Sequence, residues 1–536
     1  MKARKQVFLT LGLLLGVLGF PAARAFDQPR GTVAAANSLK IAGTIVNAVG
    51  GQPLGGAEVT IYVAGTNQLA QRFVTDSDGR FIFGNVKPGK YLLMATKGGY
   101  PQQPYQGHGQ YSTAVAAGPG LISEGLIFPM HAGASIKGTL VDDQNEPIRD
   151  AEVRLFRSEP ETGVPLTAFV ENATPDDRGQ YRFSQLPPGR YFVAVSAKPW
   201  YAAAQGSLSI GTGPRSPLDM AYPVTYFGGS TEASAATPIV LKDGDHATAD
   251  IALFPVPAIR LRVRTLGDSG NLQLRQQVFS TLVDPLIEMS KVKGAFDLHG
   301  LAPGRYQIFQ TGLGLQDGFE RVLDLTSDLE IDGAGSPIQS QVRGVVTVRG
   351  GSERVPGRTA IRLSNLQSGL ALDARISRKN DFQFEGNLAP GVYSVSFVGA
   401  PRVVVGSVVA TGATVTGHTV EIHENSPVQL AVALERGIQI DGIAQRNGKP
   451  ASAAMILLAP SDPAHNLVLF RRDQSDSDGT FSLYNVPPGT YTLLALENAW
   501  DLEWASPTAL ARYLKAGKVV QVAAGGGGAK VTVETQ

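Results

Sequence analysis

A four-residue motif, Pro-Gly-x-Tyr, recurs five times along this 536-residue chain and constrains its fold more than any other feature. Its tyrosines are Tyr91, Tyr191, Tyr306, Tyr393 and Tyr491, at successive separations of 100, 115, 87 and 98 residues. Another aromatic residue precedes each of these tyrosines by 10 or 11 positions. A repeat of this length and regularity predicts a row of about five structural units with the same internal design.

The motif itself predicts a tight turn between two strands. Proline fixes φ at the first central position and glycine supplies a positive φ at the next, so we expect a type II turn that joins a hairpin. Side chains after the tyrosine alternate in character, as in residues 191–196, which is the period of a strand. The tetrad Asp-Ser-Asp-Gly at residues 76–79 and again at 476–479 predicts a second hairpin turn.

Each unit also opens with an alternating strand, a turn slot and a further strand, as at residues 41–46, 50–53 and 57–62. About seven short strands in 80 to 120 residues are typical of a small β-sandwich. The sequence therefore predicts an all-β fold, a tandem array of about five sandwich modules. We expect a signal peptide at 1–25, a linker at 26–37, and module 1 at 38–132, module 2 at 133–256, a degenerate module 3 at 257–338, module 4 at 339–436 and module 5 at 437–536.

One short helix is expected in module 5. Ser506 suits the N-cap position and Pro507 the first helical position, good helix formers follow at 509–515, and Gly517 marks the end. Leu510 and Leu514 fall on one face, which we expect to pack against the sandwich of the same module.

The first 25 residues have the pattern of a secretory signal peptide. Lys2, Arg4 and Lys5 precede an apolar run at residues 7–20, and small residues at 23 and 25 suit cleavage before Phe26. Cleavage would change the balance of basic and acidic residues from 47 and 46 to 43 and 46. We therefore expect an exported protein, periplasmic or at the cell surface or outside the cell, with no transmembrane segment after cleavage.

Composition narrows the choice of partners. Only 17% of residues are charged and the net charge is +1, so nucleic acid is not an expected partner. The chain has no cysteine, so an exported protein of this kind must be held together by buried cores without disulfides.

The combination of these motifs resembles a known family. Gly-Thr-(Ile/Leu)-Val, then Asp-x-Asp-Gly-x-Phe-x-Phe, then Pro-Gly-x-Tyr is similar to the carboxypeptidase regulatory-like domain. This domain is a transthyretin-like sandwich grouped with carbohydrate-binding-like and starch-binding-like folds, so we expect transthyretin-like or immunoglobulin-like modules. The segment from Trp504 to Gly517 also resembles the tail of large exported bacterial proteins built from this domain. The resemblance implies a β-sandwich and export, and in this family the module is an accessory without catalytic residues.

Signals for metal or catalytic chemistry have simpler explanations. His418 and Glu421 have the spacing of a zinc pair, but residues three apart on a strand face opposite sides. The Asp-x-Asp-Gly tetrads could hold calcium, yet a turn explains them without an ion. We expect no cofactor, no metal and no enzymatic activity.

Aromatic residues after the tyrosine strands form the candidate ligand site, because loops of sandwiches often bind ligands and such rings stack on sugars. The alternative explanation is that these rings cover the open end of each sandwich. The candidate stacking residues are Tyr100, Tyr105, Trp200, Tyr201, Tyr226, Trp500 and Trp504.

The sequence thus favours an exported, non-catalytic, multi-module protein for binding, adhesion or envelope scaffolding. Its expected partner is a polysaccharide or an envelope protein, and carbohydrate binding is the sharper form of the hypothesis. The alternative is an accessory regulatory region of a secreted hydrolase system, or an enzyme that the motifs do not reveal.

Overall fold

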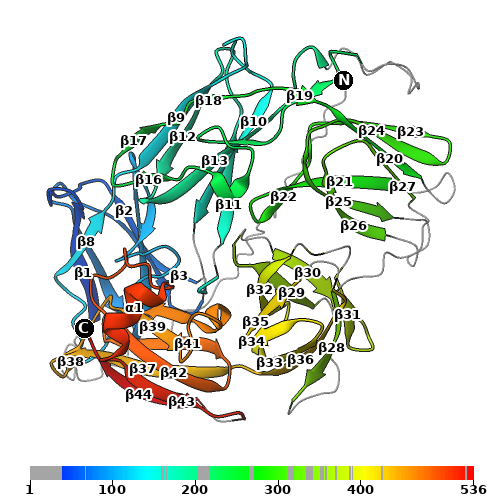
Figure 1. Ribbon diagram of the computed structural model, residues 1–536. Coiled ribbons are helices and arrows are strands. Elements are labelled where there is room, and N and C mark those ends of the chain that lie inside the picture. Colours follow the sequence, from blue (N-terminus) through cyan, green and yellow to red (C-terminus); the bar gives the residue numbers. More distant parts are fainter. Residues whose placement is uncertain are drawn as a thin grey trace, which may run out of the picture. The chain divides into compact units, whose positions relative to one another are not determined.

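A computed structural model describes residues 39–66, 68–158, 162–164, 166–202, 216–264, 271–311, 319–332, 342–349, 355, 359–367, 371–384, 388, 390–423, 426–525 and 528–536 (Figure 1). The predicted signal peptide and linker lie outside these residues. Strands dominate the described residues, which confirms the all-β prediction. Within the described ranges, no helix is long and apolar enough to cross a membrane.

Module 1 shows the plan of a single unit. One sheet has the order β4-β1-β8, and the other has the order β3-β2-β5-β6 with β7 added to β5. Alternate side chains of both sheets, such as Ile41, Ile45, Val59 and Ile61, meet in one apolar core. Its strands are β1 (Leu39–Asn47), β2 (Glu58–Val63), β3 (Leu69–Val74), β4 (Arg80–Val86), β5 (Gly89–Lys97), β6 (Tyr100–Pro104), β7 (Val115–Ala117) and β8 (Leu126–Met130).

The next two modules repeat this plan, each with its own core. Module 2 contains β9 (Ala134–Val141), β10 (Ala151–Ser158), β11 (Thr167–Ala173), β12 (Gln180–Leu186), β13 (Gly189–Ala197), β14 (Met220–Ala221), β15 (Thr225–Tyr226), β16 (Ile239–Leu241), β17 (His246–Thr248) and β18 (Ile251–Ala252), and β19 (Val256–Pro257) pairs with β14. Module 3 contains β20 (Ile259–Arg264), β21 (Asn271–Val278), β22 (Thr281–Val283), β23 (Glu288–Val292), β24 (Ala295–Leu301), β25 (Gly304–Thr311), β26 (Phe319–Leu325) and β27 (Leu329–Asp332).

The last two modules also have separate cores. Module 4 contains β28 (Val342–Val348), β29 (Ala360–Asn365), β30 (Ala371–Arg375), β31 (Asp381–Gln383), β32 (Gly391–Val398), β33 (Val403–Thr411), β34 (Thr414–Thr416), β35 (Thr419–Ile422) and β36 (Val428–Arg436). Module 5 contains β37 (Ile438–Arg446), β38 (Lys449–Pro450), β39 (Met455–Pro460), β40 (Arg471–Gln474), β41 (Thr480–Val486), β42 (Gly489–Leu496), α1 (Pro507–Leu514), β43 (Lys518–Val522) and β44 (Ala529–Glu534). The exact module boundaries stay predictions.

A parallel pairing of the first strand with a late strand is common to all five modules. The pairs are β1 with β8, β9 with β17, β20 with β27, β28 with β36, and β37 with β44. Because this pairing links residues far apart in sequence, it closes each sandwich on itself.

Glycines of the opening strands allow the closing strand to approach. A side-chain carbon on Gly43, Gly138 or Gly344 would lie less than 3.0 Å from the carbonyl oxygen of Leu126, Ala249 or Leu430, respectively. Glycine is therefore the residue that fits under this carbonyl. These positions and Gly442 pair across the sheet with the aromatic of the repeat, whereas degenerate module 3 has Val263 opposite Phe296.

The hairpin prediction for the two turn motifs is wrong. Strands β4 and β5, on either side of Pro88-Gly89, belong to different sheets, and so do β3 and β4, on either side of the Asp-Ser-Asp-Gly tetrad. Gly89 has a φ of 153° and already begins β5, so the Pro-Gly step crosses between the sheets. The sequence shows where the chain turns. A tight turn can lead either to the neighbouring strand of the same sheet or to a strand of the other sheet.

The tyrosine of the motif anchors this crossover. The buried Tyr91 hydroxyl donates to the carbonyl oxygen of Lys87 at 2.9 Å, four residues earlier, on the far side of the turn. Tyr191, Tyr306 and Tyr491 make the same bond at 2.7, 2.8 and 2.9 Å. The ring fills the core while its hydroxyl satisfies a turn carbonyl, which explains why the motif needs tyrosine.

Helix α1 confirms the expectation for module 5. Ser506 is the N-cap and its hydroxyl accepts from the Ala509 amide, with Pro507 in the first turn. The helix covers the outer face of a sheet whose strand β39 is buried along its whole length. Residues 456 and 458 enter the sandwich core, whereas 455 and 457 pack under Leu510. The helix therefore packs against its own sandwich, as predicted.

Modules 2 and 3 share an apolar contact besides their own cores. Phe156 and Tyr226 of module 2 pack with Val278, Phe279 and Val283 of module 3. The ring centroids of Phe156 and Phe279 are 4.9 Å apart. Burial of this kind stabilises a fixed contact between two modules.

Candidate functional site

Six of the seven predicted aromatic residues fall into two groups by exposure and packing. Tyr105, Tyr226 and Trp504 are buried, with 7%, 3% and 5% of their surface exposed, and pack into apolar clusters. Tyr100 packs partly buried against the core of module 1. Rings covered in this way act as core cover, as the alternative explanation expects.

The second group is the exposed Trp200 with the partly exposed Tyr201 beside it. The Trp200 side chain has 78% of its surface exposed, in the segment that follows β13 of module 2. Tyr201 lies edge-on to it, with ring centroids 5.6 Å apart and an interplanar angle of 84°. This T-shaped arrangement is a favoured geometry of aromatic pairs and leaves faces of the indole open to solvent.

Trp500 belongs to neither group, because its ring contacts another module. It stacks on His108 of module 1 with a centroid distance of 4.3 Å and an interplanar angle of 4°. Tyr111 of module 1 lies 6.0 Å away. The structure thus uses this predicted ligand ring in a contact between module 1 and module 5.

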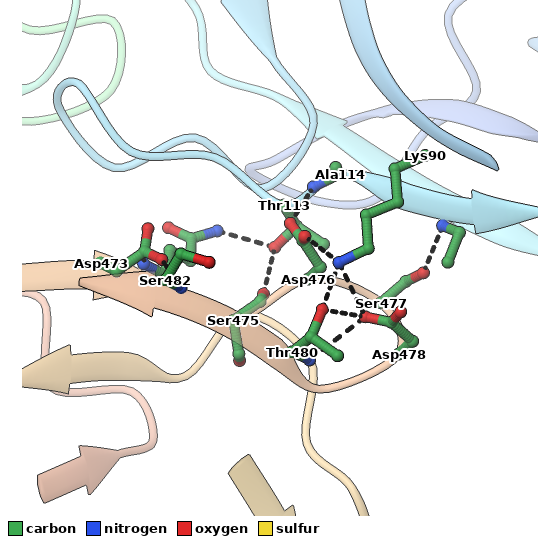
Figure 2. A network of polar contacts seen from close by, with 12 residues as sticks. Lys90, Thr113, Ala114, Asp473, Ser475, Asp476, Ser477, Asp478, Thr480 and Ser482 are labelled. Atoms are coloured by element: carbon green, nitrogen blue, oxygen red, sulfur yellow. Dashed lines mark hydrogen bonds and ion pairs between the residues drawn. The ribbon is translucent and has the colours of Figure 1, made fainter. Parts of the chain in front are cut away.

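A polar network extends this contact, and Figure 2 shows its centre. Lys90 Nζ of module 1 donates to Asp476 Oδ2 at 2.5 Å, lies 3.3 Å from Asp478 Oδ1 and also contacts the Thr480 hydroxyl. Asp476 Oδ1 accepts from the Ala114 amide at 2.9 Å. The carboxylates of the tetrad at residues 476–479 therefore bind an ammonium group. Calcium was the alternative ligand that the sequence left open for them.

Backbone groups of residues 114–116 bind the same turn. The Ser477 hydroxyl accepts from the Ala116 amide at 2.8 Å, and the Ser477 amide donates to the Ala114 carbonyl at 3.0 Å. Sequence reasoning missed this interface entirely. The identity of the two Asp-Ser-Asp-Gly tetrads gave no signal that one of them faces another module.

Gln474 forms the buried side of the contact. Its Nε2 donates to the Gln106 carbonyl at 2.6 Å and to the Thr113 hydroxyl at 2.8 Å, while Oε1 lies 3.0 Å from His108 Nδ1. Burial lowers the pKa of His108. Burial therefore disfavours the charged imidazole, while the bond with Gln474 opposes this effect.

Arginines line a neighbouring cavity of about 600 Å³. Arg472 lies over the Tyr111 and Trp504 rings, with its guanidinium carbon 4.8 and 4.3 Å from their centroids. Arg471 donates to the carbonyls of Val468, Phe470 and Asn485 at 2.6 to 2.9 Å. The hydrogen bonds of Arg471 lie within module 5, whereas Arg472 contacts rings of module 5 and of module 1.

Asp473 at the edge of this network has an unusual acidity. Burial raises its pKa to about 6, although the amides of Ser482 and Gln474 donate to its carboxylate at 2.7 and 2.8 Å. Burial also raises the pKa of Asp476 against the opposing effect of Lys90. Desolvation of the carboxylates thus outweighs their favourable contacts.

A pH dependence of stability follows for Asp473. Between about pH 4, the pKa of an exposed aspartate, and about pH 6, the folded module keeps a proton that the unfolded chain has lost. The free energy of unfolding of module 5 is expected to decrease as pH rises through this window, and Asp473→Asn should flatten that decrease. Thermal unfolding at several pH values, followed by the fluorescence of Trp500 and Trp504, measures how the stability of module 5 changes with pH. Exposed Asp501→Asn serves as control, and equal slopes for all three proteins would contradict the expectation.

Comparison with known proteins finds a family match for part of the chain. The family model of the carboxypeptidase regulatory-like domain matches residues 40–116 and 135–253. No curated protein matches the chain. Similar solved structures include a streptococcal ancillary pilin, with 11% identity, 55% of this chain and 98% of that chain covered and a TM-score of 0.19. GBS52, the minor pilin in Streptococcus agalactiae, has 16% identity, 40% and 97% coverage and a TM-score of 0.20.

A third structure, the Bacillus anthracis TIE protein, covers 93% of this chain and 75% of its own length at 10% identity and a TM-score of 0.16. Scores this low carry no argument about function. The family match, in contrast, falls on the strands of modules 1 and 2 that carry the repeated motifs. Residues 40–116 and 135–253 therefore match the carboxypeptidase regulatory-like domain family, which confirms the resemblance predicted from the motifs.

Proposed function

We propose that this protein is an exported, non-catalytic scaffold of β-sandwich modules that binds a polysaccharide through the Trp200 loop. The observation that carries the proposal is the exposed Trp200 ring with Tyr201 edge-on beside it. An indole held by a neighbouring ring presents a flat apolar face with little conformational freedom to lose on binding. The pyranose face of a sugar is a chemical match for such a surface.

Weak binding per site suits a repetitive ligand. One stacking ring contributes on the order of 1 kcal/mol, which is about a fivefold change in affinity. A polysaccharide offers many copies of its sugar, so rebinding and multivalency compensate for a low affinity at each site. The predicted place of action is the periplasm or the cell surface, where such polymers occur.

One pair of side chains in module 2 has the spacing of a catalytic pair. Ser135 Oγ lies 2.7 Å from His246 Nδ1, which is the distance between a nucleophile and its base. Ser135 is only 4% exposed, and both residues belong to paired strands β9 and β17 inside module 2. The pair therefore has a structural role, because it links the closing strand of the sandwich to the opening strand, and we do not assign it a catalytic role.

The proposal predicts that Trp200→Ala lowers polysaccharide retention about fivefold in affinity electrophoresis on a panel of polysaccharides. The fold should be unaffected, because the ring is exposed. Tyr484→Ala is the matched control, since it removes another exposed ring, 59% exposed, from module 5. Equal retention of wild type and Trp200→Ala, or no retention of wild type by any polysaccharide, would contradict the proposal.

A further inference from the structure

The contact between modules 1 and 5 differs in character from the contact between modules 2 and 3. Apolar side chains of modules 2 and 3 share one cluster. The apolar clusters of module 1 and module 5 contain no residue of the other module within the described part of the chain. Ion pairs, hydrogen bonds, the contacts of the Trp500 ring with His108 and Tyr111, and the guanidinium of Arg472 over Tyr111 hold modules 1 and 5 together. Charged and hydrogen-bonding groups are well solvated when they separate.

The two sides of this contact are complementary in charge and in hydrogen bonding. Module 1 contributes the Lys90 ammonium and the amides of Ala114 and Ala116, all donors. Module 5 contributes the carboxylates of Asp476 and Asp478 and the Ser477 hydroxyl as acceptors. Each side therefore recognises the other specifically, whichever molecule carries it.

Asp476 also has a second set of partners for the state in which module 1 is absent. In the identical tetrad of module 1, Asp76 Oδ1 accepts from the amides two and four positions later, at 3.0 and 2.8 Å. Asp176 of module 2 makes the same two bonds at 2.9 and 2.8 Å. The amides of Asp478 and Thr480 occupy these positions in module 5, so Asp476 can cap its own turn after release.

We propose that the contact between modules 1 and 5 is exchangeable and that its second partner is another copy of this chain. Module 1 of one copy binds the residue 474–480 turn of another through the same bonds that it makes within its own chain. The exchange needs no new complementarity, because the surfaces are the same in both cases. Within one copy the tether favours the closed contact, and a high local concentration of chains favours exchange.

Charge reversal separates the closed and exchanged forms. Lys90→Glu places a carboxylate against Asp476 and Asp478, and Asp476→Lys places an ammonium against Lys90, so each variant repels itself within one chain and between identical chains. In a mixture, the introduced glutamate of one variant meets the introduced lysine of the other at one contact, and the native Lys90 and Asp476 meet at the second. Light scattering coupled to size exclusion should find each variant alone as a monomer and the mixture as a particle of twice the mass.

Three comparisons make the result decisive. The double variant Lys90→Glu/Asp476→Lys should be a monomer, because its own contact is restored with reversed charges. Lys87→Glu, an exposed neighbour on the same turn, should form no dimer with Asp476→Lys. High salt should dissociate the mixed dimer by screening the ion pairs. A monomeric mixture of two folded variants at low salt would overturn the proposal.

Folding of the variants is checked by circular dichroism. If Asp476→Lys does not fold, Asp478→Lys replaces it, since this carboxylate also contacts Lys90, at 3.3 Å. The mixture of Asp478→Lys with Lys90→Glu is then expected to form a particle of twice the mass. A monomeric mixture of these two variants would again overturn the proposal. The test is independent of polysaccharide binding, because Trp200 lies outside this contact.

Discussion

Replacing Trp504 with alanine is expected to destabilise module 5 by about 3–5 kcal/mol, the usual range for removing a buried large aromatic. The indole packs with Leu510, Met455 and Leu457 between helix α1 and the sheet. Its ring centroid lies 5.7 Å from that of Phe470. Alanine would leave a cavity that the helix and the sheet, which is buried on both faces, cannot fill without shifting toward each other.

Trp200→Ala is the matched control, because it makes the same substitution at an exposed ring. Calorimetry of the two variants should show a large loss of stability only for Trp504→Ala. Equal melting profiles would mean that Trp504 does not support the packing of the helix, and they would make this residue a candidate ligand ring again.

Gly43→Ala is the second substitution with a large expected effect, on module 1. The added carbon would overlap the carbonyl oxygen of Leu126 on the closing strand β8. Overpacking of this kind costs about 1–3 kcal/mol, and displacement of strand β8 adds about 1–3 kcal/mol for each buried backbone group that loses its hydrogen bond. We expect the melting temperature of module 1 to fall by more than about 10 °C, given the sensitivity of domains of this size.

Gly84→Ala, in β4 of the same module, is the control for Gly43→Ala. No atom lies within 4 Å of the added carbon at this position, so alanine should be tolerated or slightly stabilising. Differential scanning calorimetry compares the two variants directly. Similar melting temperatures for both would show that β8 can move away from β1 without loss of stability.

Local signals predicted the elements of the fold but not their assignment to sheets. The period of two and the repeat spacing indicated strands, and Ser506 and Pro507 indicated the helix start, because these patterns express backbone and burial preferences within a few residues. Pro88-Gly89 indicated a turn for the same reason. Its crossing to the other sheet depends on the Tyr91 anchor and on strands distant in sequence.

The candidate ligand residues illustrate the same limit. Trp200 and Trp504 both follow a tyrosine strand, and both are amphipathic rings in segments predicted as loops. Trp504 is buried because a helix folds back over it, and Trp200 is exposed. Exposure is a property of the assembled module and cannot be read from the local sequence. The ligand role of these rings stays a prediction, and among the seven candidates Trp200, with Tyr201 beside it, has the exposed ring that stacking on a sugar requires.

The two Asp-Ser-Asp-Gly tetrads show most directly what each level determines. The sequence by itself determined that both form a turn, because Asp accepts amide bonds and Gly takes the positive φ of 71° at Gly79 and 75° at Gly479. Only the tertiary structure decided that Asp76 caps its own turn while Asp476 binds Lys90 and the Ala114 amide of module 1. A carboxylate binds the strongest donors that the fold brings near, and which donors these are depends on residues more than 350 positions away.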